Sequence, residues 1–439
     1  MFLGKPPCMP EKRAIVMPLR TDGLKLSEVL VIFGVVLAGT GMYWRIGGTQ
    51  VNLSLSDGVL VLAVFAMVLH EVARPRSIRA DACASVIVLL GFLWLGCIFI
   101  SFTQPLVGAY ANSNTMILAA MKAAVSIAYL LWMPLYVNSG LVGQRAIVLS
   151  LQSWCIVSST IVLMSRVPAF RSTLYFAGLR LQGLFRDPNL YALYAGQAGI
   201  IASGFAVCSR RLNRLNYIAQ WILCTLGVVL SGSRTAMVAY GLSSIALAIA
   251  EKRMRRLAPT MLLLCLCIIV VSPLREQLSW SIERLGWGSY SEGLASRSHV
   301  WEDAILAAKA HPLTGVGRGH LVSWRERHGL ASRLIAHNTY IGVFAETGVL
   351  GAVIFSLLFM GLPVRLATRL LRMTGERGIM GRTLCAAFVC TWVGALGLDV
   401  ENYRLGWLVV GMAAALVMPC QTSDVVYTRQ QITHPTGQR

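Results

Sequence analysis

Five of the seven histidines in this chain of 439 residues lie in one polar segment between two apolar runs. These histidines are His299, His311, His320, His328 and His337. A zinc site on a helix needs histidines at positions i and i+4 with further carboxylate or cysteine ligands, and no pair here has that pattern. We therefore predict that the chain binds no metal and needs no cofactor.

His337 differs from the other histidines in its position. It opens an apolar run as His337-Asn338-Thr339-Tyr340, at the boundary between polar and apolar sequence. An imidazole has an unperturbed pKa of about 6.5, so it accepts a proton at neutral pH. A lone histidine at such a boundary is more often an interfacial anchor, and a general base is the alternative role for His337. Asn338, the next residue, is a candidate supporting group in that case.

Three arginines each lie just before a predicted helix elsewhere in the chain. One lies in Phe185-Arg-Asp-Pro-Asn189, where the proline suits the first turn of a helix and the aspartate suits its N-cap. Another ends the turn Ser231-Gly-Ser-Arg234, and the third precedes an amphipathic stretch. These arginines are Arg186, Arg234 and Arg297. A guanidinium grips phosphate with two parallel hydrogen bonds, so this set suits a diphosphate group. A snorkelling interfacial residue is the alternative role for Arg234.

Two further polar residues are candidate supporting groups. Asn189 follows the proline of the first motif and either has a structural role or faces a cavity. Asp399 lies with Glu401 in the last short polar loop. Cations beside a proton acceptor suit a reaction in which a hydroxyl displaces a diphosphate leaving group, because fixed positive charge stabilises the departing anion.

The composition shows what kind of protein positions these groups. The chain is 56% hydrophobic and only 13% charged, and its mean hydropathy is +0.64. A soluble domain carries about 25% charged residues. The composition therefore excludes a soluble enzyme, a disulfide scaffold or a nucleic-acid module as the class of the whole chain. The net charge of +20 is the excess that the positive-inside rule predicts for a multi-span protein, so it does not indicate nucleic acid as a partner.

Apolar runs predict an all-α polytopic membrane protein with about twelve transmembrane helices. The predicted spans are 27–44, 54–70, 82–103, 115–137, 146–165, 189–208, 216–231, 235–250, 257–272, 338–362, 383–398 and 404–419. Basic residues alternate between successive loops in a way that places both termini in the cytoplasm. Lys122 is the basic residue within a span, and helix packing or snorkelling explains it best.

The spans divide the chain into four parts. Residues 1–272 hold helices 1–9, residues 273–337 form an outer helical segment, residues 338–419 hold helices 10–12, and residues 420–439 form a cytoplasmic tail. The outer segment carries eight basic residues and the outer loop 166–188 carries four, against the usual charge bias. Within the outer segment, the apolar period predicts a helix over 298–310, a bend over 313–320 and a short helix over 320–328.

Five short motifs between residues 185 and 351 match a known pattern. They are Phe185-Arg-Asp-Pro-Asn189, Ser231-Gly-Ser-Arg-Thr235, Ser296-Arg-Ser-His-Val-Trp-Glu-Asp-Ala304, His311-Pro-Leu-Thr-Gly-Val-Gly317, and His337-Asn-Thr-Tyr with Glu346-Thr-Gly-Val-Leu-Gly351. Together they resemble the O-antigen ligase/polymerase superfamily of bacterial envelope enzymes. The size of the chain and its single long outer segment resemble the ligase branch most.

This resemblance implies both a fold and a reaction. The implied fold is helical and similar to that of the class C glycosyltransferases. The implied reaction moves O-antigen polysaccharide from undecaprenyl diphosphate to lipid A-core, in the inner membrane with the active site facing the periplasm. The reaction inverts the configuration at the anomeric carbon and needs no metal. The resemblance implies that His337 is the general base and that Arg186, Arg234 and Arg297 bind the diphosphate. It also implies that Asp399 is the acidic residue found near the end of the chain in this family.

Three alternatives remain open at this stage. An O-antigen polymerase uses the same donor with a second lipid-linked glycan as acceptor, and a protein O-oligosaccharyltransferase uses a protein. A transporter of lipid-linked glycans belongs to a different class. The sequence contains no paired half-repeats and few in-span charges, which disfavours transport.

Overall fold

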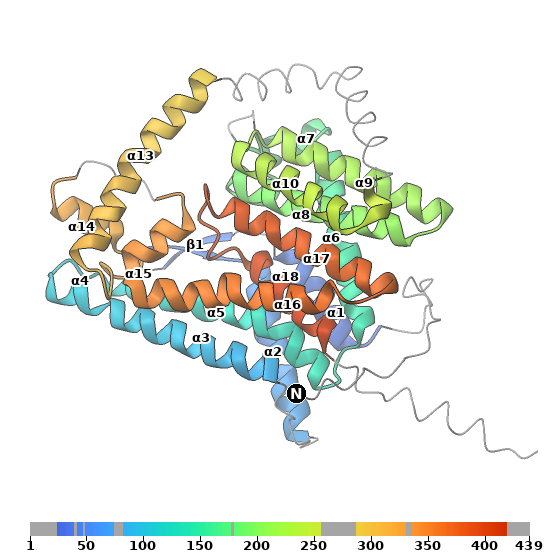
Figure 1. Cartoon of the computed structure of the whole chain (residues 1–439), viewed down its shortest axis with the longest axis horizontal. Coiled ribbons are helices and arrows are strands. Elements are labelled where there is room, and N and C mark those ends of the chain that lie inside the picture. The colour runs from blue at the N-terminus through green and yellow to red at the C-terminus, as the bar shows by residue number, and fades with distance from the viewer. Residues whose placement is uncertain are drawn as a thin grey trace, which may run out of the picture.

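The computed structural model describes residues 24–38, 42–46, 49–73, 82–176, 180–255, 287–330 and 336–418. These residues are almost entirely helical (Figure 1). The N-terminal half comprises α1 (Leu26–Leu37), β1 (Met42–Ile46), β2 (Thr49–Leu53), α2 (Leu55–Ala73), α3 (Ala82–Ser101), α4 (Thr103–Val107), α5 (Ser113–Asn138), α6 (Gln144–Met164), α7 (Pro168–Leu174), β3 (Tyr175–Phe176), β4 (Arg180–Leu181) and α8 (Pro188–Cys208). The remainder comprises α9 (Arg211–Leu230), α10 (Arg234–Ala250), α13 (Trp287–Ala310), α14 (Leu321–Arg327), α15 (Thr339–Ser356), the π-helix η1 (Leu357–Gly361), α16 (Leu362–Leu370), α17 (Gly375–Gly394) and α18 (Arg404–Val417).

A helix lies at each predicted span except 257–272, which falls outside the described residues together with the tail 420–439. Five helical stretches are long and apolar enough to cross a membrane by length and composition. They are Ser85–Val107, Ser113–Asn138, Gln144–Met164, Pro188–Cys208 and Thr339–Leu370. Shorter apolar helices accompany them at α1, α2, α10 and α18. The chain is therefore a multi-span helical membrane protein.

The first predicted span was too long at its C-terminal end. Helix α1 ends at Leu37, and residues 42–46 form β1, which pairs antiparallel with β2 from Met42 opposite Leu53 to Ile46 opposite Thr49. Hydropathy alone does not separate a helix from an apolar strand. The glycines at 39 and 41 weaken helix propensity, and the aromatic pair that follows suits a strand.

Helix α8 lies at the centre of one group of helices, with α9, α10 and α17 around it (Figure 1). Its side chains are buried almost throughout. Glycines allow the close approach that membrane helices use: a Cβ on Gly204 would lie 2.2 Å from Oγ1 of Thr383 on α17. A second group contains α3, α5, α15 and α18, and contacts between α17 and α18 join the two groups.

Helix α15 contains a break that receives a loop from the preceding segment. Gly348 has φ 66° and ψ −168°, far from helical values. The loop before α14 lies against this break, with Val316 N donating to Ala345 O at 3.0 Å and Gly317 N donating to Glu346 O at 3.0 Å. A Cβ on Gly315 would lie 2.3 Å from the carbonyl carbon of Glu346. The motifs His311–Gly317 and Glu346–Gly351 are therefore two halves of one structural unit.

We expect Gly348→Ala to destabilise the protein by about 2–5 kcal/mol. Alanine disfavours the left-handed region, and its Cβ would lie 2.4 Å from the carbonyl carbon of Leu313. The measurement is thermal unfolding of purified protein in detergent. Gly241→Ala is the matched control, because a Cβ there meets nothing within 4 Å and φ is ordinary. Equal melting temperatures for the two variants would contradict the tight packing of this unit.

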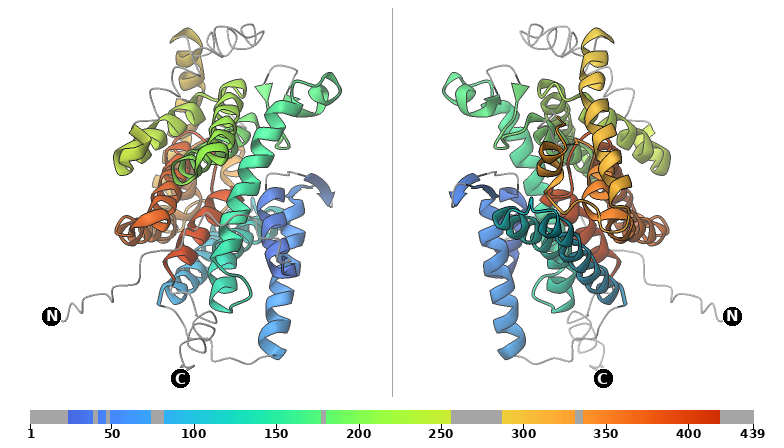
Figure 2. Two further views of the ribbon diagram at one scale, coloured as in Figure 1. Left: turned by 90° about the vertical axis from the view of Figure 1, so that its right-hand side faces the viewer. Right: turned by 90° about the vertical axis from the view of Figure 1, so that its left-hand side faces the viewer.

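Helix α13 is longer than predicted. The predicted helix 298–310 is present, but α13 already begins at Trp287. Its lower part packs on α14 and α15 through a small apolar cluster that includes Val300, Ala304 and Ala307. Figure 2 shows α13 projecting beyond one end of the helical bundle, while α2 projects beyond the other. The predicted helix 320–328 is present as α14, and the predicted bend precedes it.

Candidate functional site

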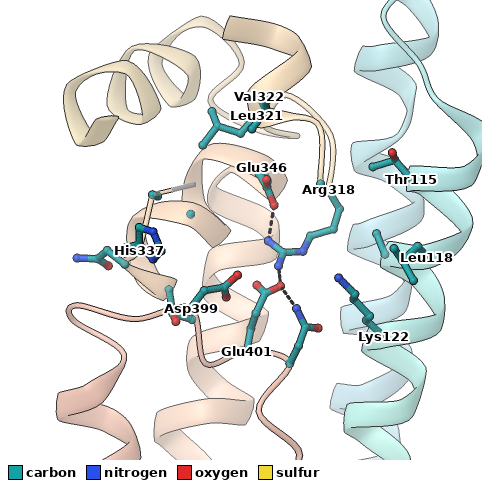
Figure 3. Close-up of a pocket in the computed structure, with 17 residues that line it drawn as sticks. Thr115, Leu118, Lys122, Arg318, Leu321, Val322, His337, Glu346, Asp399 and Glu401 are labelled. Atoms are coloured by element: carbon teal, nitrogen blue, oxygen red, sulfur yellow. Dashed lines mark hydrogen bonds and ion pairs between the residues drawn. The ribbon is translucent and has the colours of Figure 1, made fainter. Parts of the chain in front are cut away.

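A cavity of about 230 Å³ lies where several helix ends meet. The start of α5, the loop before α14, the start of α15 and the loop between α17 and α18 form its walls (Figure 3). His337, Asn338 and Asp399 line it, so three of the residues predicted from the sequence lie together. Arg186, Asn189, Arg234 and Arg297 do not line this cavity.

His337 has a backbone conformation that is rare for residues other than glycine. Its φ is 46°, in the left-handed region, which costs about 1–2 kcal/mol. Both neighbours are fixed: Trp301 Nε1 donates to Ala336 O at 2.7 Å, and Asn338 caps α15 by accepting hydrogen bonds from two backbone amides. Strain of this kind accumulates at functional sites, where it orients a side chain. Here it accompanies an imidazole at the wall of the cavity.

Thr339 connects the start of α15 to the loop that carries Asp399. Its Oγ1 donates to Leu398 O at 2.8 Å and accepts from Val400 N at 2.9 Å. The backbone N of Thr339 donates to Ala395 O at 2.9 Å. These bonds place His337 and Asp399 on the same wall of the cavity, as Figure 3 shows.

The surroundings of His337 lower the pKa of its imidazole. Burial is the largest cause, and the positive charge of Arg297 acts in the same direction. Asp187 and Asp399 oppose the shift, because each carboxylate favours the charged ring. The imidazole is therefore neutral at pH 7. It makes no hydrogen bond to another residue within the described part of the chain, so its lone pair is available to a substrate.

Arg297 lies near His337 but outside the cavity, and Arg234 lies near Arg297. Arg297 on α13 is half-buried and donates from Nη1 to Gly397 O at 3.3 Å. Burial and the charge of Arg234 lower the pKa of Arg297, so these two guanidinium groups act on the same region. Arg234 is the first residue of α10, after the Ser233 cap. Arg186 is exposed, one residue before the cap of α8.

Asn189 is part of a hydrogen-bonded connection between two turns. Asp187 Oδ1 accepts from the backbone and side-chain nitrogens of Asn189, both at 2.8 Å. Asn189 Oδ1 accepts from Arg180 Nη2 at 2.8 Å, while Arg180 Nε donates to Ser231 O at 2.7 Å. Arg180 thus joins the start of α8 to the turn before Arg234. Arg180 is one of the four basic residues of the outer loop 166–188, and nothing in the sequence indicated that it belongs to the site.

A buried ion-pair network forms part of the cavity wall. Arg318 is paired with Glu346 at 2.5 Å and with Glu401 on its other side. Asn402 Nδ2 donates to Glu401 Oε1 at 2.9 Å (Figure 3). In the sequence, Arg318 is one of the eight basic residues of the outer segment, Glu346 is a motif position and Glu401 lies in the last short polar loop. The sequence did not predict that they pair. Glycines on both sides of Arg318 were the available signal, because they allow its backbone to enter the break in α15.

Two of the clustered histidines have structural roles. His320 is fully buried, with Nδ1 bonded to Arg318 O at 2.9 Å and Nε2 accepting from Asn112 N at 3.2 Å. His328 stacks on Trp324 with ring centroids 4.2 Å apart. In the part of the chain that the structure describes, no three His, Cys, Asp or Glu side chains are grouped as metal ligands.

The fold and the cavity together define a class: a multi-span helical membrane protein with a polar pocket at the ends of its helices. Residues 220–356 match the model of a family described as O-antigen ligase. This segment, from α9 to the end of α15, contains Arg234, Arg297 and His337. This segment of the chain is therefore similar to the O-antigen ligase/polymerase family, whose members are glycan-transferring enzymes. No curated protein and no solved structure matches the chain.

Proposed function

We propose that this protein is an O-antigen ligase. It transfers O-antigen polysaccharide from undecaprenyl diphosphate to lipid A-core during lipopolysaccharide biosynthesis. The observation that carries the proposal is the position of His337 at the cavity wall, with Arg297 acting on its imidazole and Arg234 acting on Arg297. This combination provides a base for an incoming hydroxyl and positive charge for a departing diphosphate.

The reaction is a single displacement. The acceptor hydroxyl gives its proton to His337 as its oxygen attacks the anomeric carbon. The bond between that carbon and the diphosphate oxygen breaks, and its electron pair leaves with the diphosphate. Arg297, Arg234 and Arg186 stabilise the developing charge. Attack from the face opposite the leaving group inverts the anomeric carbon, and the proton later passes from the imidazolium to solvent.

We also propose that the cavity opens on the periplasmic side of the membrane. The starts of α5, α15 and α18 meet at the cavity, and these helices correspond to the fourth, tenth and twelfth predicted spans. Even-numbered spans all begin on one side when the chain alternates across a bilayer. With both termini in the cytoplasm of a bacterial inner membrane, that side is the periplasm, where the outer segment 273–337 lies.

The test of the function is a reconstituted reaction with purified protein, lipid-linked O-antigen and lipid A-core, with the products sized on a gel. A ligase places glycan on lipid A-core. Longer lipid-linked glycan with bare lipid A-core would instead identify a polymerase. Glycan on an added acceptor protein would identify a protein O-oligosaccharyltransferase. Movement of unchanged donor across proteoliposome membranes would identify a transporter.

We expect transfer to be unaffected by a strong chelator. The arginines supply the charge stabilisation for which many diphosphate-dependent transferases use a divalent cation. The measurement is the initial rate with and without excess chelator after dialysis against it. Complete loss of activity that Mg²⁺ or Mn²⁺ restores would contradict a metal-independent reaction.

We expect Arg180→Lys to lower kcat/KM by about 10–100-fold, the range that small errors of positioning produce. A lysine cannot reach both Asn189 Oδ1 and Ser231 O, so the turns carrying Asp187 and Arg234 would lose their connection. Arg171→Lys on the exposed face of α7 is the control. Because Arg180 acts through other residues, kcat should fall without a change in the pH profile. A variant with normal kcat would count against this positioning role.

A further inference from the structure

Two charged side chains at the cavity have no hydrogen bond or ion pair with another described residue. They are Lys122 on α5 and Asp399 on the loop before α18. Arg318, Glu346 and Glu401 are already paired, because Arg318 forms ion pairs with both carboxylates. Figure 3 shows Lys122 pointing from α5 into the cavity, across from His337 and Asp399. A charged side chain in an otherwise apolar membrane helix is costly to bury, so its presence indicates a functional site.

The charge of the cavity disfavours a diphosphate as its occupant. Lys122 and Arg318 provide two positive charges, whereas Glu346, Asp399 and Glu401 provide three negative ones. Arg297, whose charge acts on His337, and Arg234, whose charge acts on Arg297, lie outside the cavity and suit an anion. The arginine pair and the cavity therefore differ in charge. The arginines are cationic, whereas the cavity carries mixed charge with a slight negative excess.

The chemistry of the cavity favours a neutral polyol. Beside Lys122 and Asp399, the side chains of Thr115, Asn338 and Asn402 add hydroxyl and amide groups. Donors and acceptors in one cavity match the hydroxyls of a sugar ring, each of which both donates and accepts hydrogen bonds. The volume of about 230 Å³ is below the range of about 300–1,000 Å³ for drug-sized ligands, which suits one sugar ring rather than a polysaccharide.

We infer that this cavity is the subsite for the acceptor sugar, with Lys122 and Asp399 binding its hydroxyls and His337 removing the proton from the one that reacts. The inference rests on the proposed function and deepens it. The donor diphosphate then lies on the side of Arg297 and Arg234. Inversion requires the acceptor oxygen to attack from the face opposite the leaving group, so the acceptor and the diphosphate need separate subsites next to His337.

The test is direct binding of two separate probes to purified protein in detergent. One probe is the core oligosaccharide released from lipid A, and the other is undecaprenyl diphosphate. Lys122→Met retains the length of the side chain but removes its charge. We expect it to weaken core-oligosaccharide binding at least 10-fold more than it weakens carrier binding. Lys309→Met, at an exposed position on α13, is the matched control and should bind both probes as the wild type does.

Asp399→Asn is a second variant, in case Lys122→Met does not fold. It should also weaken oligosaccharide binding more than carrier binding. Unchanged oligosaccharide binding in a folded variant, or a larger loss of carrier binding, would overturn the inference. Because binding is measured without turnover, a protein that failed to transfer glycan would refute the proposed function and still give a clear result for the subsite. In transfer assays, we expect either variant to raise the KM for the acceptor more than it raises the KM for the donor.

Discussion

His337→Ala should lower kcat/KM for glycan transfer by about 10²–10⁴-fold, the contribution of a positioned general base. The imidazole lines the cavity, and its lowered pKa favours the neutral form at pH 7, so it can accept a proton from a bound hydroxyl. His299→Ala is the control, because this histidine is exposed on α13. The measurement is the initial rate of transfer by purified protein. A His337→Ala variant retaining more than a tenth of the wild-type rate would exclude the base role.

The pH profile provides an independent readout of the same group. Burial and Arg297 lower the pKa of His337 below its ordinary value of about 6.5. The base works only when neutral, so kcat/KM should rise with pH through that lowered pKa and be level at neutral pH. Removing the charge with Arg297→Gln should move the acidic limb towards higher pH. An acidic limb above pH 7 in the wild type would contradict this electrostatic description.

Arg297→Lys and Arg234→Lys should each lower kcat by about 10²-fold or more, similar to the loss of one oxyanion-stabilising donor. Both variants retain the charge but lose the planar fork that binds a diphosphate with two hydrogen bonds. Because the interaction strengthens as charge develops, the effect should fall on kcat more than on donor KM. Arg186→Lys belongs to the same series as the third predicted diphosphate ligand.

The control for this series is Arg327→Lys, at an exposed position on α14 that donates to Ala109 O. The double variant of Arg234 and Arg297 shows whether the two act as a unit, since its loss should be smaller than the product of the single losses. Wild-type turnover in all the lysine variants would remove the arginines from the mechanism.

Much of the fold was predictable because hydropathy and capping are local properties. The start of α8 illustrates this: proline at the first turn and Asp187 at the cap are both readable from five residues. Likewise, the Asn338 cap fixes where α15 begins and places His337 just before it. The hairpin of β1 and β2 was missed, because an apolar aromatic run fits a helix or a strand equally well until its partner strand is known.

The ion-pair network at the cavity was not predictable from local patterns. Arg318 and Glu401 are 83 positions apart, in two separate outer segments of the predicted topology, and no local pattern pairs them. They meet because the loop before α14 packs against the break in α15, while Thr339 at the start of α15 holds the loop that carries Glu401. The role of Lys122 was missed for the same reason: a lone lysine in a span is explained by snorkelling until the cavity it enters is visible. The division into 1–272, 273–337, 338–419 and 420–439 stays a prediction.

The central claim is that a glycan leaves a diphosphate carrier for an acceptor at the His337 cavity. The most direct measurement follows undecaprenyl diphosphate release and glycosylated lipid A-core together, in wild type and His337→Ala. We predict equal amounts of both products from the wild type and loss of both in the variant. Glycan that moves across the membrane while still attached to its carrier, or equal yields from the two proteins, would contradict the account.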